Sequence, residues 1–176
     1  MNHQTRTVTS VVRPIVLSCS LLLMVGYLMG QPRSGESKGA QKLSASSIQI
    51  EPTDPADVPM PPEFRIAIYE NLIAQIDKTG KFQHVYRSGD MDAAKVPDLV
   101  TLHTSVRSFT KGSQKEREVT TIKGSTSLTL NVNITDHAGK TIVDRDVQGK
   151  VRFMGENLRA TYDFSKKVAD IVRTTF

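Results

Sequence analysis

Along positions 127–135 of this chain, apolar and polar residues alternate without a break. This period of two predicts a β-strand, because successive side chains of a strand point to opposite faces of its sheet. A strand with one polar face is typical of an antiparallel sheet with one side open to water. The apolar set is Leu128, Leu130, Val132 and Ile134, and the polar set is Thr129, Asn131, Asn133 and Thr135.

Four further segments carry a strand pattern. Short strands are expected at 48–50 and 82–87, a longer one at 98–109, and a return strand after the Asp136–Gly139 turn. The longer strand places Val100, Leu102, Thr104 and Val106 on one face, and the return strand places Val143, Val147, Val151 and Phe153 on one face. The hydrophilic run 111–118 predicts a hairpin loop.

Two segments show the helical period. The first begins near Pro62 and ends near Gly80, which suits a left-handed C-terminal cap. Its apolar face is wide enough to predict a deeply embedded helix, with Phe64, Ile68, Leu72 and Ile76 widened by Ile66, Tyr69 and Ile73. The last helix follows Gly155, with Asn157 as its expected N-cap. Its apolar face holds Leu158, Thr161, Tyr162, Ser165, Val168, Ala169, Val172 and Phe176, and its polar face holds Arg159, Asp163, Lys166, Lys167, Asp170 and Arg173.

The order of these elements predicts an α+β fold. We expect a two-layer sandwich, in which two amphipathic helices cover one face of a largely antiparallel mixed sheet. A single domain is expected over residues 48–176. The small, polar residues 31–47 have no hydrophobic period and predict a flexible linker.

The first thirty residues predict a signal peptide or an N-terminal membrane anchor. Arg6 and Arg13 precede an uncharged run over 15–29, which is the order of a basic region and an apolar region in an export signal. The residues expected to contact the membrane are Ile15, Val16, Leu17, Leu21, Leu22, Leu23, Met24, Val25, Leu28 and Met29.

The fate of this leader is left open by its sequence. The run is shorter than the roughly 20 residues that a spanning helix needs, yet no small-residue pattern marks a cleavage site near Gly30. An uncleaved anchor, a cleaved signal and lipidation at Cys19, the only cysteine, remain the three interpretations. All three place the domain in the cell envelope on the exported side of the cytoplasmic membrane, which is the periplasm of a Gram-negative cell.

Charge argues against a nucleic-acid partner. The formal net charge is +5, but residues 45–176 hold 18 of the 23 basic and 17 of the 18 acidic residues. A domain so close to neutrality lacks the basic footprint of a duplex-binding protein.

Candidate chemistry is sparse. His84, His103 and His137 have no metal-ligand spacing, so no metal or cofactor is expected. Asp144 and Asp146 have the spacing of a glycosidase carboxylate pair, but Arg145 and Lys150 beside them favour a charge-balanced surface. The Ser108–Lys111 spacing matches the Ser-x-x-Lys of penicillin-recognising enzymes without their other motifs.

Several motifs together resemble a known family. They are Asp98–Val100, Phe109–Ser113 with Arg117, the Gly124–Lys140 strand-and-turn pattern, and the Gly155–Thr161 entry to the last helix. This pattern resembles DUF4410, a bacterial envelope domain of unknown function. Its fold is similar to accessory lipoproteins and to the N-terminal domain of TolB. The resemblance implies a role in envelope assembly or transport rather than catalysis.

The sequence therefore predicts a non-enzymatic, exported envelope protein with a protein partner and a membrane contact through its N-terminal segment. The polar face Thr129, Asn131, Asn133 and Thr135 is the candidate interaction face, where a partner could add a strand. A small exported hydrolase and a free periplasmic ligand-binding domain are the alternatives.

Overall fold

The computed structural model describes residues 43–176, apart from 56–57, 121–122 and 153–154. The predicted membrane segment lies outside the described residues, as does most of the predicted linker. None of the helices among the described residues has the length and apolar character that crossing a bilayer requires.

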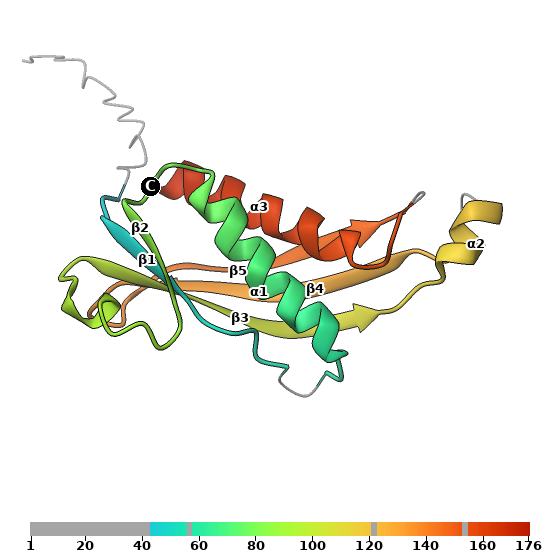
Figure 1. The fold of residues 1–176 in the computed structure, drawn as a ribbon, viewed down its shortest axis with the longest axis horizontal. Helices are drawn as coiled ribbons and strands as arrows, with labels where there is room; N and C mark the ends of the chain where they lie inside the picture. The colour runs from blue at the N-terminus through green and yellow to red at the C-terminus, as the bar shows by residue number, and fades with distance from the viewer. Residues whose placement is uncertain (1–42, 56–57, 121–122, 153–154) are drawn as a thin grey trace, which may run out of the picture. The chain divides into compact units, whose positions relative to one another are not determined.

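Five strands form one mixed sheet in the order β2-β1-β3-β4-β5 (Figure 1). β1 pairs in parallel with both β2 and β3, whereas β3, β4 and β5 pair in antiparallel fashion. The strands are β1 (Ser47–Ile50), β2 (His84–Arg87), β3 (Leu99–Thr110), β4 (Thr126–Thr135) and β5 (Thr141–Val151). A 3₁₀ turn, Ala93–Lys95, lies between β2 and β3.

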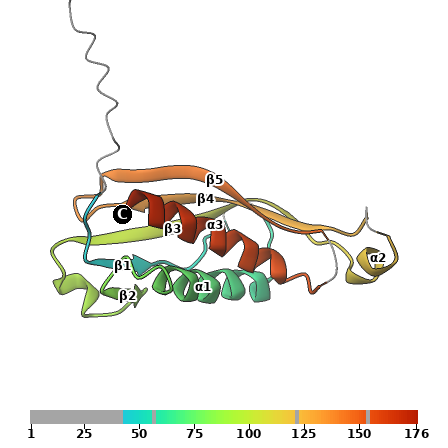
Figure 2. The same cartoon turned by 90° about the horizontal axis from the view of Figure 1, so that it is seen from above.

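Two helices cover one face of this sheet. α1 (Pro62–Asp77) packs over the β1 and β2 side, and α3 (Arg159–Thr175) packs over β4 and β5 (Figure 2). Among the described residues, the opposite face carries no helix. The predicted α+β two-layer sandwich is confirmed.

The core lies between the two helices and the inner sheet face. The predicted apolar positions of β3 and β4 are buried, as are Val143, Val147 and Val151 of β5, while Phe153 lies outside the described residues. Phe64, Ile68, Leu72 and Ile76 of α1 are also buried. Some positions on the helix faces were predicted wrongly. Ala160 and Phe164 are fully buried although they were missing from the predicted face, whereas Ile66 and Tyr162, both predicted on apolar faces, are 63% and 43% exposed. Since a helix turns about 100° per residue, Ile66 lies nearly opposite Phe64 on α1.

A bulge in β3 decides where its aromatic residue points. The register to β4 shifts between Val106 and Ser108. This shift turns Phe109 toward the helices, where its ring meets Phe64 edge-on at a centroid distance of 4.8 Å. A bulge changes the alternation of a strand in this way because one extra residue is left unpaired.

Two local predictions need correction. The expected hairpin loop contains a helix, α2 (Gln114–Val119), whose first turn is capped by the Ser113 hydroxyl accepting from the Glu116 amide at 3.3 Å. Asn157 does not cap α3, because its side-chain oxygen accepts hydrogen bonds from Thr126 and Arg117 instead. The predicted left-handed cap is confirmed at Gly80, where φ is 63°.

Candidate interaction surfaces

The predicted interaction face lies on the side of the sheet away from the helices. Thr129, Asn131, Asn133 and Thr135 alternate along β4 with fully buried apolar residues, and each is half-buried. Register places Ser105 of β3 and Asp146 of β5 on either side of Asn131. The face is therefore continuous across the three antiparallel strands.

A small polar cluster occupies this face. The Asn131 amide donates to Asp144 at 2.8 Å and to Asp146 at 3.2 Å, and Arg107 lies 3.8 Å from Asp146. Both carboxylates lie on an open sheet face and share Asn131 as a donor, while Arg107 pairs with Asp146 alone. The geometry supports the charge-balanced surface that the sequence favoured over a glycosidase pair.

β5 is the last strand of the sheet, and half of its free edge is blocked. The backbone N–H of Lys150 donates to the Asp163 carboxylate at 3.0 Å, and the Gln148 carbonyl accepts from Lys167 at 2.8 Å. Both groups face away from β4. Since backbone groups alternate in direction along a strand, those of Asp144 and Asp146 face the same free edge. No α3 side chain bonds to the edge there in the described residues.

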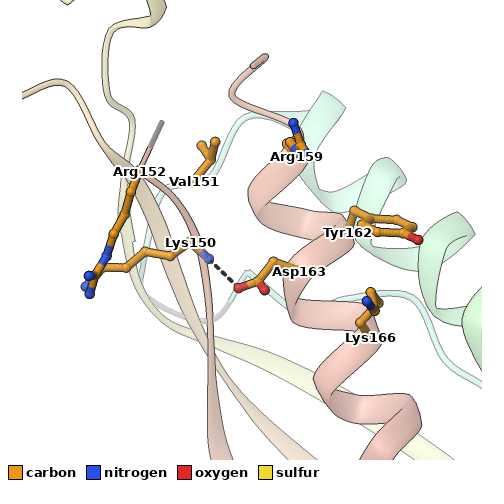
Figure 3. A pocket seen from close by; sticks show the side chains of 7 residues that line it. All are labelled: Lys150, Val151, Arg152, Arg159, Tyr162, Asp163 and Lys166. Carbon is orange, nitrogen blue, oxygen red and sulfur yellow. Dashed lines mark hydrogen bonds between the residues drawn. The ribbon is translucent and has the colours of Figure 1, made fainter. Parts of the chain in front are cut away.

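A basic hollow lies where the end of β5 passes the first turns of α3 (Figure 3). In this view Lys150 and Arg152 extend from β5 to the side away from α3, while Arg159, Tyr162 and Lys166 stand along α3. The hollow has a volume of about 350 Å³, and it is lined by Lys150, Val151, Arg152, Arg159, Tyr162, Asp163 and Lys166.

The only carboxylate of this hollow is already paired. Asp163 lies 2.8 Å from Lys167 and also accepts the Lys150 backbone N–H. Within the described part of the chain, the other four cations form no ion pair: Lys150, Arg152, Arg159 and Lys166. The hollow therefore carries a local excess of positive charge.

The three histidines of the domain do not converge. His84 lies on β2, His103 on β3 and His137 in the β4–β5 turn. No group of three or more His, Cys, Asp or Glu residues in the described ranges is placed to hold a metal ion.

One shallow hollow does bring an Asp, a His and a Ser together. Asp54, His103 and Ser105 line a space of about 180 Å³ on the outer sheet face, beside Asn131 and Asn133. No hydrogen bond joins the Ser105 hydroxyl to the His103 ring among the described residues. Serine nucleophiles are commonly activated through such a bond to an adjacent base.

Residues that carry the family resemblance meet in a polar network. The buried Arg117 guanidinium donates to the carbonyls of Gly124 and Gly155 and to the Asn157 side chain. Asn157 in turn donates to the Gly112 carbonyl at 3.2 Å. This network joins α2 and its loops to the entry of α3, so these residues have a structural role.

Sequence reasoning found the polar face of β4 and missed the basic hollow. Its α3 cations had been assigned to a solvated helix face, and Lys150 to a balanced strand surface. The available signal was a local concentration of five basic residues within positions 150–167. The near-neutral net charge of the whole domain gave no indication of this concentration. Net charge does not determine how charges are distributed.

No protein-family model and no curated protein sequence matches this chain. The resemblance to DUF4410 therefore stays a prediction.

Several solved structures are similar to this chain. The PelC dodecamer from Paraburkholderia phytofirmans matches with a TM-score of 0.56 at 7% identity, covering 76% of this chain and 92% of that one. XCC0632 from Xanthomonas campestris, of the family DUF330, matches with a TM-score of 0.49 at 12% identity, covering 76% and 86%. A lipoprotein candidate from Caulobacter crescentus matches with a TM-score of 0.36 at 14% identity, covering 70% and 88%. At these identities the likeness concerns the fold alone.

Proposed function

We propose that this protein is a non-catalytic component of the bacterial cell envelope, exported and held by its N-terminal segment. Its α+β domain binds another protein through the open half of the β5 edge and the adjoining polar face of β4. This function is an accessory one in the assembly or transport of an envelope complex.

The observation that carries the proposal is the division of the β5 edge. A free edge is a template for another strand, and proteins commonly block such edges with charges or with a covering element. Here α3 blocks the edge at Gln148 and Lys150 but not at Asp144 and Asp146. The polar, half-buried face beside the open half supplies side-chain contacts that an added strand needs for specificity.

The similar fold adds one supporting argument. The PelC structure is described as a dodecamer, so at least one protein of this fold assembles through protein–protein contacts. A second copy of the present chain is accordingly the first partner to test.

Site-specific photo-crosslinking in living cells tests the edge. A photoreactive benzoylphenylalanine would replace Asp144 in the open half of β5 in the full chain. Position 148 provides the matched control, because Gln148 lies on the same strand and face but beside the blocked edge. We expect a defined higher-mass adduct from position 144 and little from position 148.

A proline substitution tests whether the adduct depends on the addition of a strand. Asp146→Pro removes an N–H that faces the free edge, while the ladder to β4 keeps its own bonds. The adduct at position 144 should fall at least several-fold in this variant. Equal adducts at both positions, or an adduct that the proline leaves unchanged, would refute the edge as the binding site.

Cell fractionation with intact mass measurement tests the location. A full-length mass in the membrane fraction is expected if the leader is a retained anchor. A soluble species that begins near residue 31 would instead favour a free periplasmic domain.

A further inference from the structure

We infer that the basic hollow between the end of β5 and α3 binds a ligand that carries more than one phosphate group. Two residues of each wall supply the positive charge: Lys150 and Arg152 on the β5 side, and Arg159 and Lys166 on α3. This site is separate from the open half of the β5 edge.

Unpaired charge is the first argument. Six cations of the described domain form ion pairs with carboxylates, among them Arg87 with Glu70 at 2.7 Å and Arg173 with Asp170 at 2.7 Å. The four cations of the hollow have no such partner among the described residues, and Asp163 is taken by Lys167. An anion placed among them would relieve their mutual repulsion.

The kinds of side chain favour phosphate. Arginine presents a planar fork of donors that matches phosphate oxygens, and lysine adds a compact charge. The hollow holds two of each. Its backbone donors contribute little, since the amides of Arg159, Ala160 and Thr161 at the start of α3 already bond to carbonyls of the preceding turn.

The arrangement of the walls favours more than one phosphate group. Figure 3 shows the side chains of Lys150 and Arg152 extending from β5 to the side away from α3, and those of Arg159 and Lys166 standing along α3, so the two pairs of charges lie apart. A volume of about 350 Å³ is also larger than a single phosphate requires. The exposed ring of Tyr162, 43% accessible, supplies an apolar surface between the α3 cations.

Duplex nucleic acid fits this surface poorly. Duplex-binding proteins commonly neutralise about 6–10 phosphates along an extended face. The cations here are confined to one hollow in a domain whose total charge is close to zero. A soluble phosphate ester and an array of anionic lipid headgroups share the chemistry that the hollow would recognise.

Titration calorimetry on the purified full chain, in neutral detergent, tests the soluble source. Tripolyphosphate is the probe, against sodium chloride at matched ionic strength. We expect binding by the wild type that weakens at least tenfold in the double variant Arg159→Gln/Lys166→Gln. The control Lys78→Gln/Lys115→Gln makes the same change in net charge at exposed sites outside the hollow, and it should bind as the wild type does.

Vesicle flotation tests the lipid source. Because the leader can insert into any bilayer, the measured quantity is the gain in binding on phosphatidylglycerol-containing vesicles over pure phosphatidylcholine vesicles. That gain should fall in the hollow variant and persist in the control variant. Binding of tripolyphosphate without a preference for anionic vesicles identifies a soluble ligand. A preference for anionic vesicles without binding of tripolyphosphate identifies lipid headgroups.

Two outcomes would overturn the inference. One is a wild-type chain that neither binds tripolyphosphate nor prefers anionic vesicles. The other is equal weakening in the hollow and control variants, which would show a general charge effect. Neither outcome bears on the β5 edge, whose test uses other residues.

Discussion

At the scale of single residues, side-chain hydrogen bonds join the segment directly before β1 to the segment directly before β3. Asp98, just before β3, accepts hydrogen bonds from the Ser46 amide at 2.8 Å and from the Ser46 hydroxyl at 2.5 Å. These bonds favour the carboxylate and lower the pKa of Asp98. Glu70 also has a lowered pKa, because the Arg87 guanidinium donates to both of its oxygens.

Removing the Ser46 hydroxyl should produce an acid-dependent loss of stability. A carboxyl whose pKa is lowered on folding stabilises the protein above its unfolded pKa of about 3.9, and this contribution disappears as the pH falls through the lower folded value. Ser46→Ala should therefore unfold at lower urea than the wild type at pH 7, and the two should converge in strong acid.

The midpoints of urea unfolding, measured from pH 7 to pH 2, give the difference in stability between the wild type and Ser46→Ala. The Glu70 contribution is present in both proteins and cancels from the comparison. In an Asp98→Asn background, Ser46→Ala should lose its pH dependence. A gap that stays constant from pH 7 to pH 2 would contradict the assignment to Asp98.

At the scale of elements, one glycine sets how closely α3 approaches β5. A Cβ built on Gly149 would lie 2.2 Å from the Ala160 carbonyl oxygen and 2.6 Å from the Phe164 Cβ. Both neighbours belong to the first turns of α3, so a side chain at position 149 would push the helix off the sheet. The same approach brings Asp163 and Lys167 to the edge of β5.

Gly149→Ala should destabilise the domain by about 3 kcal/mol, at the upper end of the cost of overpacking a core. Gly139→Ala is the control, because Gly139 has open space around it and a φ of 79°. Its substitution should cost about 1 kcal/mol from backbone strain alone. Chemical denaturation measures both, and an equal cost at the two positions would show that close packing of α3 is not the cause.

At the scale of the whole molecule, the short strand β1 joins the two sides of the sheet. β1 has only four residues, yet it lies between β2 and β3 and pairs with both. Ile48 and Ile50 are fully buried beneath the helices. Loss of packing at β1 therefore affects the β2–α1 side and the antiparallel strands together.

Ile50→Ala should lower the free energy of unfolding by about 2–5 kcal/mol, as expected for a large cavity in a core. Helix circular dichroism and tyrosine fluorescence should report the same shifted midpoint, because one core joins all elements. The control Val85→Ala, on the edge strand β2 where the side chain is only half-buried, should cost less. Separate transitions for the two probes would indicate that the halves unfold independently.

The order of elements, the fold class and most core positions could be predicted from the sequence, because they depend on local periodicity. The strand at 127–135 is the clearest case, since each alternate residue is buried as predicted. The Gly80 cap also followed from local backbone preference. The α2 helix was missed although its Ser113 and Glu116 spacing is a capping signal that the sequence contains.

By itself, the sequence determined the alternation that separates core from surface, since side-chain direction follows from strand and helix period. Only the tertiary structure decided which distant residues meet. It placed β1 between β2 and β3, turned Phe109 inward through a bulge, and brought Lys150 and Arg152 to the same hollow as the cations of α3. These outcomes depend on strand register and on the approach of α3 at Gly149, which are long-range contacts that no local pattern encodes.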